Sequence, residues 1–175
     1  MRLFIAVNFD EEFKKTLLRY QSELKKYADP YHGDLRSRVN WSSPANLHLT
    51  LAFIGEYNSP ENVRAVLDEV PFDPFIIRTG KCGNFGSLWW VGLDGGNEAV
   101  ALSNSIRAGL KSAGIPYDPK PMKPHITLAR ELYPLHPPRI KPIPAETTAA
   151  RVSLMKSERI AGKLTYTEVY GINAR

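Results

Sequence analysis

The sequence has little cysteine and no long hydrophobic segment. Its single cysteine, Cys82, excludes an intramolecular disulfide and any metal site that needs several thiolates. No run approaches the roughly 18 apolar residues that a membrane span requires. The short apolar run near the start ends at Asn8 and is followed by acidic residues, unlike a signal peptide. We therefore expect a protein of the cytoplasm that does not associate with membranes.

Several familiar binding motifs are also missing. The sequence has no His-Glu-x-x-His pair, no glycine-rich phosphate loop and no array of Asp and Asn residues suited to calcium. Charge of one sign does not dominate either, because 23 Lys and Arg residues face 18 Asp and Glu residues, a net charge of +5. This mild excess favours anionic partners such as nucleic acid but locates no site. We expect no metal and no other cofactor.

A chain of 175 residues, 43% of them hydrophobic, is large enough for one stable domain. Seven segments have the apolar, β-branched or aromatic content typical of strands: 2–9, 47–54, 75–81, 88–93, 125–130, 151–156 and 163–170. Three others repeat apolar residues at helical spacing: 13–27, 63–70 and 100–110. No linker divides the chain, so we expect a single α+β domain over residues 1–175.

The two halves of the chain share one pattern. Each has a strand, a helix, a loop preceded by proline, and then a strand that opens with His-x-Thr-Leu. The first copy spans 2–51 and the second spans 88–128. Two copies are too few for a solenoid, so this repeat predicts one domain made of two interleaved, pseudo-twofold lobes.

The repeated motif gives each copy a polar and an apolar face. Side chains alternate along a strand, so His48 and Thr50 should point to one face while Leu49, Leu51 and Phe53 point to the other. The same alternation separates His125 and Thr127 from the two apolar residues of their motif, Ile126 and Leu128. If the halves pack about a pseudo-dyad, the two His/Thr pairs face each other across a central cleft.

Two imidazoles in one cleft suit displacement at phosphorus. The ordinary pKa of histidine is near 6.5, so one ring can be neutral and act as base while the other, beside an anionic phosphate, stays protonated and acts as acid. Threonine hydroxyls can donate hydrogen bonds to the non-bridging phosphoryl oxygens, where charge develops. The scheme needs no metal.

The segments NLHLTLAFIGE (46–56) and KPHITLARE (123–131) resemble the paired signatures of the 2H phosphoesterase superfamily. The resemblance is specifically to its RNA 2′,3′-cyclic phosphodiesterases, also called 2′-5′ RNA ligases, and it extends to RLFIAVNF (2–9) and LWWVGLDG (88–95). It implies a bilobal fold in which two antiparallel sheets face a central cleft and helices lie outside. It also implies hydrolysis of RNA 2′,3′-cyclic phosphate ends to 2′-phosphomonoesters, with possible reverse 2′-5′ ligation.

The resemblance also implies a role for each motif residue. His48 matches the proton donor to the departing 3′ oxygen, and His125 matches the proton acceptor that activates water. Thr50 and Thr127 match the phosphate-binding threonines. From the residues alone, acid and base stay unassigned, because the repeat makes the two histidines nearly equivalent.

Arg130 is predicted to bind phosphate, because the family has an arginine five residues after the second histidine. Strict alternation, however, puts Arg130 on the face opposite His125. Either the strand ends or twists there, or Arg130 is a peripheral charge. Lys123, just before the motif, is expected to be solvated.

Other residues that could take part in chemistry are expected to be structural. His32 and His136 lie in loops and have no partner at a catalytic spacing. Five aromatic residues invite a role in base stacking, although we expect most of them in the core and one at the rim of the cleft: Phe53, Phe85, Trp89, Trp90 and Tyr166.

Two alternatives to the leading function remain open. The chain could act on other 3′ RNA ends or on small cyclic nucleotides, as another branch of the superfamily, or it could bind RNA ends without turnover. The expected partners are RNA with 2′,3′-cyclic phosphate ends or small cyclic nucleotides. We expect a monomer.

Overall fold

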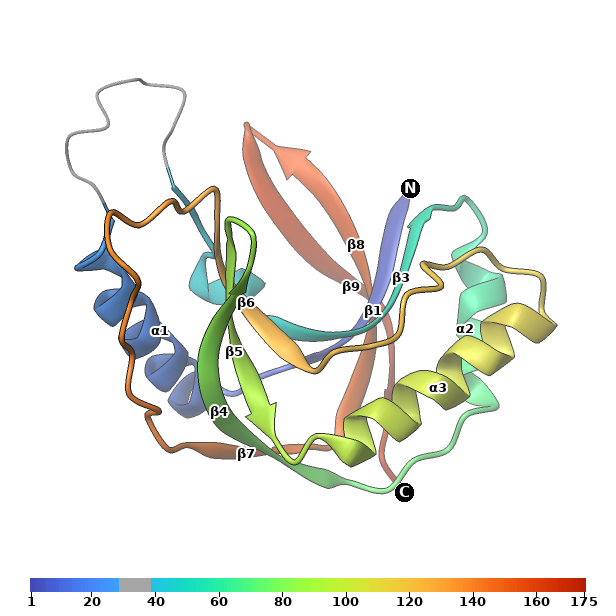
Figure 1. Ribbon diagram of the computed structural model, residues 1–175. Helices are drawn as coiled ribbons and strands as arrows, with labels where there is room; N and C mark the ends of the chain where they lie inside the picture. Colours follow the sequence, from blue (N-terminus) through green and yellow to red (C-terminus); the bar gives the residue numbers. More distant parts are fainter. Residues whose placement is uncertain (29–38) are drawn as a thin grey trace.

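The computed structural model describes residues 1–28 and 39–175 as an α+β domain (Figure 1). Its strands are β1 (Arg2–Asn8), β2 (Asn40–Trp41), β3 (His48–Glu56), β4 (Phe75–Phe85), β5 (Leu88–Asp94), β6 (His125–Arg130), β7 (Glu146–Ala149), β8 (Arg151–Ile160) and β9 (Lys163–Asn173). Its helices are α1 (Glu11–Lys25), α2 (Pro60–Asp68), α3 (Asn97–Ser112) and a short 3₁₀ helix, η1 (Pro44–Asn46). Among these described helices, none is long and apolar enough to cross a membrane.

The predicted strands and helices are all present, and two strands were missed. Strand β2 has only two residues, too few to produce a periodic pattern. Strand β7 has the sequence ETTA and follows a proline-rich loop, so nothing local marks it as a strand. It forms because β4 offers a free edge, where Phe75 pairs with Ala149 and Arg78 with Glu146. Strand formation at β7 is therefore a tertiary effect.

The prediction of two separate sheets is wrong, because the described strands form one continuous sheet. Its order is β7-β4-β5-β6-β3-β1-β8-β9, with β2 paired to β6, and every pairing is antiparallel. The halves meet where β3 lies beside β6, through the single pair Leu49 and Ile126. This short junction lets the sheet curl, with α1 on one side of the molecule and α2 and α3 together on the other (Figure 1).

One face of the curled sheet packs on the helices and forms the main core. Leu49 and Leu51 of β3 and Ile126 and Leu128 of β6 belong to this core, as their motifs predict. The helices contribute apolar side chains from one face each: Leu17, Tyr20 and Leu24 of α1, Val63 and Leu67 of α2, and Ile106 and Leu110 of α3. A second, small cluster consists of Phe4, Ala6 and Met155, with Tyr166 packed against it.

Each motif strand contains a β-bulge at the leucine after its threonine. In β3, Ala6 of β1 pairs with Thr50 and Ile5 pairs with Ala52, so Leu51 is an extra residue. In β6, Trp90 pairs with Thr127 and Trp89 pairs with Ala129, so Leu128 is an extra residue. A bulge puts two successive side chains on one face and shifts the alternation that follows. Leu51 and Ala52 are accordingly both buried, and so are Leu128 and Ala129.

The carbonyl groups at the two bulges are satisfied by buried polar side chains of the helices. The Ser103 hydroxyl of α3 donates to the carbonyl of Leu51 at 2.5 Å. The Gln21 amide of α1 donates to the carbonyl of Leu128 at 2.9 Å, and the Ser42 backbone N–H donates to the same carbonyl. Since a buried carbonyl without a donor is costly, these contacts stabilise the bulges.

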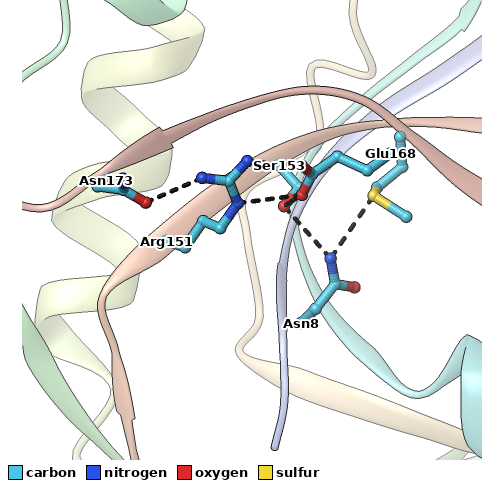
Figure 2. Close-up of polar contacts among 6 residues, drawn as sticks. Asn8, Arg151, Ser153, Glu168 and Asn173 are labelled. Carbon is cyan, nitrogen blue, oxygen red and sulfur yellow. Dashed lines mark hydrogen bonds and ion pairs between the residues drawn. The ribbon is translucent and has the colours of Figure 1, made fainter.

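A polar network ties β1 to the last two strands (Figure 2). The side-chain amide of Asn8 donates to the Ser153 hydroxyl, which donates to Glu168 at 2.5 Å. Arg151 forms an ion pair with the same carboxylate and donates to Asn173. Asn8 is also the backbone partner of His48. The network therefore holds the end of β1 that lies beside the first motif.

We predict that Ser103→Ala destabilises the fold and Ser105→Ala does not. Removing the Ser103 hydroxyl leaves the buried Leu51 carbonyl without this donor, which should lower the free energy of unfolding by about 1–3 kcal/mol. Ser105 lies on the exposed side of the same helix and bonds only to the Ala101 carbonyl of its own helix. Urea unfolding of both variants measures the difference, and equal midpoints would contradict this account of the bulge.

Candidate active site

The two motif strands place their polar side chains in one cleft at the centre of the sheet. The cleft has a volume of about 900 Å³, and its lining includes His48 and Thr50 of β3, His125 and Thr127 of β6, and Arg130. All five residues singled out from the sequence therefore meet in one place. They lie on the face of the sheet opposite the main core, because β3 and β6 are the two central strands and bury their leucines on the other side.

Both imidazoles are held in the same way. Nδ1 of His48 lies 2.7 Å from the carbonyl of Asn46, and Nδ1 of His125 lies 2.6 Å from the carbonyl of Lys123. A carbonyl oxygen only accepts, so Nδ1 carries a proton in each ring and Nε2 remains for chemistry. Nε2 of His48 lies 3.0 Å from the Thr50 hydroxyl. In each copy the acceptor is the residue two positions before the histidine.

Aromatic rings contact each imidazole in a matching arrangement. The centre of the His48 ring lies 4.9 Å from the centre of the Phe4 ring and 5.3 Å from that of the Tyr166 ring. The Phe4 and Tyr166 rings also contact each other. The His125 ring lies 5.3 Å from Phe85 and 6.4 Å from Trp90, which also contact each other. These contacts restrict the tilt of both imidazoles.

The expectation that most of the five aromatic residues fill the core is wrong. Trp89 does so, and its indole N–H donates to the carbonyl of Leu132. The other four lie at the cleft or against its histidines: Phe53, Phe85, Trp90 and Tyr166. Trp90 lies flat over two glycines, and a Cβ at Gly83 would overlap its ring. Sheet positions without side chains thus make room for an indole beside His125.

The bulges explain how Arg130 reaches the cleft. Uninterrupted alternation would place it opposite His125, but the extra residue Leu128 returns it to the histidine face, where it lines the cleft. The bulge at Leu51 does the same for Phe53, so the prediction that Phe53 shares a face with Leu49 is wrong. Arg130 and Phe53 occupy equivalent places in the two copies of the motif, three residues after the threonine.

The surroundings make the two histidines unequal. Burial is the largest of the effects that together lower the pKa of His48 from 6.5 to about 4. The hydrogen bond to the Asn46 carbonyl opposes this shift, and charge at Arg130 and His125 adds to it. His48 is therefore neutral at neutral pH when the cleft holds no anion. The sequence repeat alone could not separate the two rings in this way.

The remaining residues with possible chemistry lie outside the group of His48, Thr50, His125, Thr127 and Arg130 in the cleft. Lys123 holds its ammonium 5.6 Å from the centre of the Phe85 ring, at the margin of the site. His136 is exposed and does not line the cleft, and His32 lies outside the described residues. Burial raises the pKa of the Cys82 thiol to about 11, so this thiol stays protonated.

Sequence reasoning missed Asn46 as a residue of the site. Its carbonyl accepts the Nδ1 proton of His48, and its side-chain amide donates to the carbonyl of Leu164 in β9 at 2.9 Å. Asn46 thus connects the first histidine to the β8–β9 hairpin. Asn46 and Lys123 hold the same position in the two copies of the motif, two residues before the histidine. Aligning the two copies would therefore have pointed to Asn46.

Comparison with known proteins agrees with the site. The family described as the 2′-5′ RNA ligase superfamily matches residues 22–161. Over 137 residues the chain is 34% identical to a protein of Archaeoglobus fulgidus, covering 74% of this chain and 72% of that one. The chain belongs to the 2′-5′ RNA ligase superfamily, as predicted. Within it, the Archaeoglobus protein is named RNA 2′,3′-cyclic phosphodiesterase, as is a Thermus thermophilus protein that is 32% identical over 160 residues, 82% of this chain and 74% of that one.

Solved structures share the fold. Escherichia coli LigT without ligand superposes with a TM-score of 0.80 at 22% identity, covering 99% of this chain and 96% of that one. A Thermus thermophilus protein superposes with a TM-score of 0.79 at 29% identity, covering 100% of this chain and 98% of that one. The predicted α+β class is confirmed.

We predict that the pKa of His48 is near 4 in the free protein and rises when inorganic phosphate occupies the cleft. Burial and the nearby charge of Arg130 disfavour protonation of His48, and a bound anion should offset that charge. Arg130→Gln should raise the same pKa without phosphate, because that charge is gone. NMR titration of the ring resonances, assigned with His48→Gln, measures both shifts. An unshifted pKa near 6.5 in the free protein would contradict the prediction.

Proposed function

We propose that this chain hydrolyses 2′,3′-cyclic phosphate ends of RNA to 2′-phosphomonoesters. The observation that carries the proposal is the pairing of two His/Thr motifs in one cleft, each with Nδ1 bonded to a backbone carbonyl. Nε2 is then the ring nitrogen that can gain or lose a proton, and in His48 it lies beside the Thr50 hydroxyl. The names of the relatives in Archaeoglobus and Thermus support the same activity.

In the proposed reaction, Nε2 of His125 takes a proton from a water molecule as its oxygen attacks phosphorus. The bond between phosphorus and O3′ breaks, and Nε2–H of His48 gives its proton to O3′. The products are a 2′-phosphomonoester and a 3′-hydroxyl. His48 must therefore gain its proton as the anionic substrate binds, since it is neutral in the free protein.

The hydroxyls of Thr50 and Thr127 and the guanidinium of Arg130 are the proposed phosphate-binding groups. All three line the same cleft as the histidines and can donate hydrogen bonds to the non-bridging oxygens, where negative charge must be held. The steps use only groups of the chain itself. A 5′-hydroxyl in place of water would give a 2′-5′ linkage by the same proton transfers.

We also infer that the two halves are related by a pseudo-twofold axis. The support is the matched placement of β3 and β6 at the centre of the sheet, of the bulges at Leu51 and Leu128, and of the aromatic pairs beside each histidine. A cytoplasmic location and a monomeric state stay predictions.

We predict that His48→Ala and His125→Ala each lower kcat by about 10²- to 10⁴-fold, the usual contribution of one acid or base. His136→Ala, which removes an exposed histidine away from the cleft, is the control and should leave the rate unchanged. The assay uses an RNA oligonucleotide with a 2′,3′-cyclic phosphate end, in the presence of a chelator. The rate should be bell-shaped in pH, and full activity of either cleft variant would refute the mechanism.

The product separates the proposal from its alternatives. A 2′-phosphate detected by ³¹P NMR supports the proposal, whereas a 3′-phosphate would assign the chain to another branch of the superfamily. Tight binding of cyclic-ended RNA without product would favour a non-catalytic binder.

We predict that Arg130→Gln lowers kcat/KM by about 10²-fold, the cost of removing one donor to a developing oxyanion. Arg130→Lys should recover part of this loss, because it keeps the charge but not the planar pair of donors. Arg139→Gln makes the same change of charge in an exposed loop away from the cleft. Equal kcat/KM for Arg130→Gln and Arg139→Gln would show that Arg130 is a peripheral charge.

A further inference from the structure

The cleft continues into two side pockets of different chemistry. The first, here the apolar arm, has a volume of about 480 Å³ beside Thr50 and His125 and is lined by Phe53, Phe85 and Met122. The second, here the basic arm, has a volume of about 310 Å³ beside His48 and Thr127. Its charged lining residues are Arg130, Arg159 and Lys163.

The basic arm carries positive charge without a carboxylate among its described lining residues. Arg159 and Lys163 come from the tip of the β8–β9 hairpin, which projects at the top of Figure 1. Arg159 spans the turn and donates to the carbonyl of Gly162 at 3.1 Å. The hydrogen bond from Asn46 to Leu164 anchors this hairpin beside His48. The two cations are thus held next to the reacting centre.

The apolar arm differs although it also contains cations. One terminal nitrogen of the Arg107 guanidinium donates to the backbone carbonyls of both Asp118 and Lys120. Lys120, Lys123 and the carboxylate of Asp118 also line this arm, so its cations are accompanied by an acidic group.

Phe53 and Phe85 are partly exposed aromatic rings, each with a cation over its ring, Arg2 over Phe53 and Lys123 over Phe85. The exposed remainder of both rings is apolar surface that a ligand can contact. Such surface suits a nucleobase, which stacks on aromatic side chains.

A cyclic-phosphate end of RNA presents groups that match this division. Beyond the cyclic phosphate itself, its terminal nucleotide has one flat base and one anionic phosphodiester on the 5′ side, whereas a cyclic mononucleotide has only the base. We propose that the apolar arm takes the terminal base and the basic arm takes the 5′ phosphodiester, so that the site favours oligonucleotide ends over cyclic mononucleotides. This inference rests on the proposed hydrolytic function.

The test measures kcat/KM of the protein for three substrates at low salt. They are adenosine 2′,3′-cyclic phosphate, the dinucleotide ApA with a 2′,3′-cyclic phosphate end, and the same dinucleotide with an uncharged methylphosphonate linkage. The ordinary dinucleotide should have a kcat/KM about two- to fivefold above the mononucleotide, the effect of one partly exposed ion pair with a phosphate. The methylphosphonate should behave like the mononucleotide.

Substitutions in the basic arm test whether Arg159 and Lys163 bind the 5′ phosphodiester. Lys163→Gln and Arg159→Gln should each reduce the ratio of kcat/KM for the ordinary dinucleotide to that for the mononucleotide, and they should flatten its dependence on salt. A substitution that lowers kcat/KM equally for both substrates leaves this ratio unchanged, so the ratio reports only the contribution of the 5′ phosphodiester. Lys15→Gln, an equal change of charge on the outer face of α1, is the matched control and should retain the full ratio.

The outcomes separate this inference from the function on which it rests. No turnover of any substrate would contradict the proposed function. Turnover of all three with equal efficiency would contradict the basic arm alone. A methylphosphonate dinucleotide as good as the ordinary one, or a full ratio in both Lys163→Gln and Arg159→Gln, would also overturn it.

Discussion

Two backbone carbonyls, those of Leu51 and Leu128, lie where the sheet is shaped to form the candidate active site. Each lies at a bulge in a central strand and accepts a hydrogen bond from a buried helix side chain, Ser103 or Gln21. Because a buried carbonyl without a donor costs about 1–3 kcal/mol, these donors stabilise the bulges, and at Leu128 the Ser42 backbone N–H shares this role. The bulges in turn direct Phe53 and Arg130 into the cleft. Side chains on the far face of the sheet therefore help to decide which groups line the cleft.

The cleft is built from equivalent parts that end up in unequal environments. Each histidine bonds to a carbonyl two residues earlier and contacts two aromatic rings. Burial nevertheless leaves His48 neutral in the free protein. A site of this kind can divide the roles of acid and base between two copies of one motif, because protonation depends on solvent exposure and neighbouring charge as much as on residue type.

The hairpin of β8 and β9 links the reacting centre to the more distant parts of the site. Asn46 joins it to His48, while the network of Asn8, Ser153 and Glu168 joins its base to β1, the strand beside His48 (Figure 2). The basic residues at its tip and the first histidine therefore belong to one connected unit. This connection gives the proposed distinction between an RNA end and a mononucleotide a structural basis.

Local sequence determined much of this protein. Apolar periodicity was enough to predict the main strands and helices, and the repeated His-x-Thr-Leu motif identified five residues that line the cleft. Both signals lie within a few neighbouring positions of the sequence. Only the tertiary structure decided that the halves share one sheet and that β7 forms. It also decided that bulges turn Arg130 and Phe53 toward the histidines, and that His48 is the more buried of the two rings. These features depend on donors, strand edges and solvent exclusion supplied by residues far away in the chain, so no short segment encodes them.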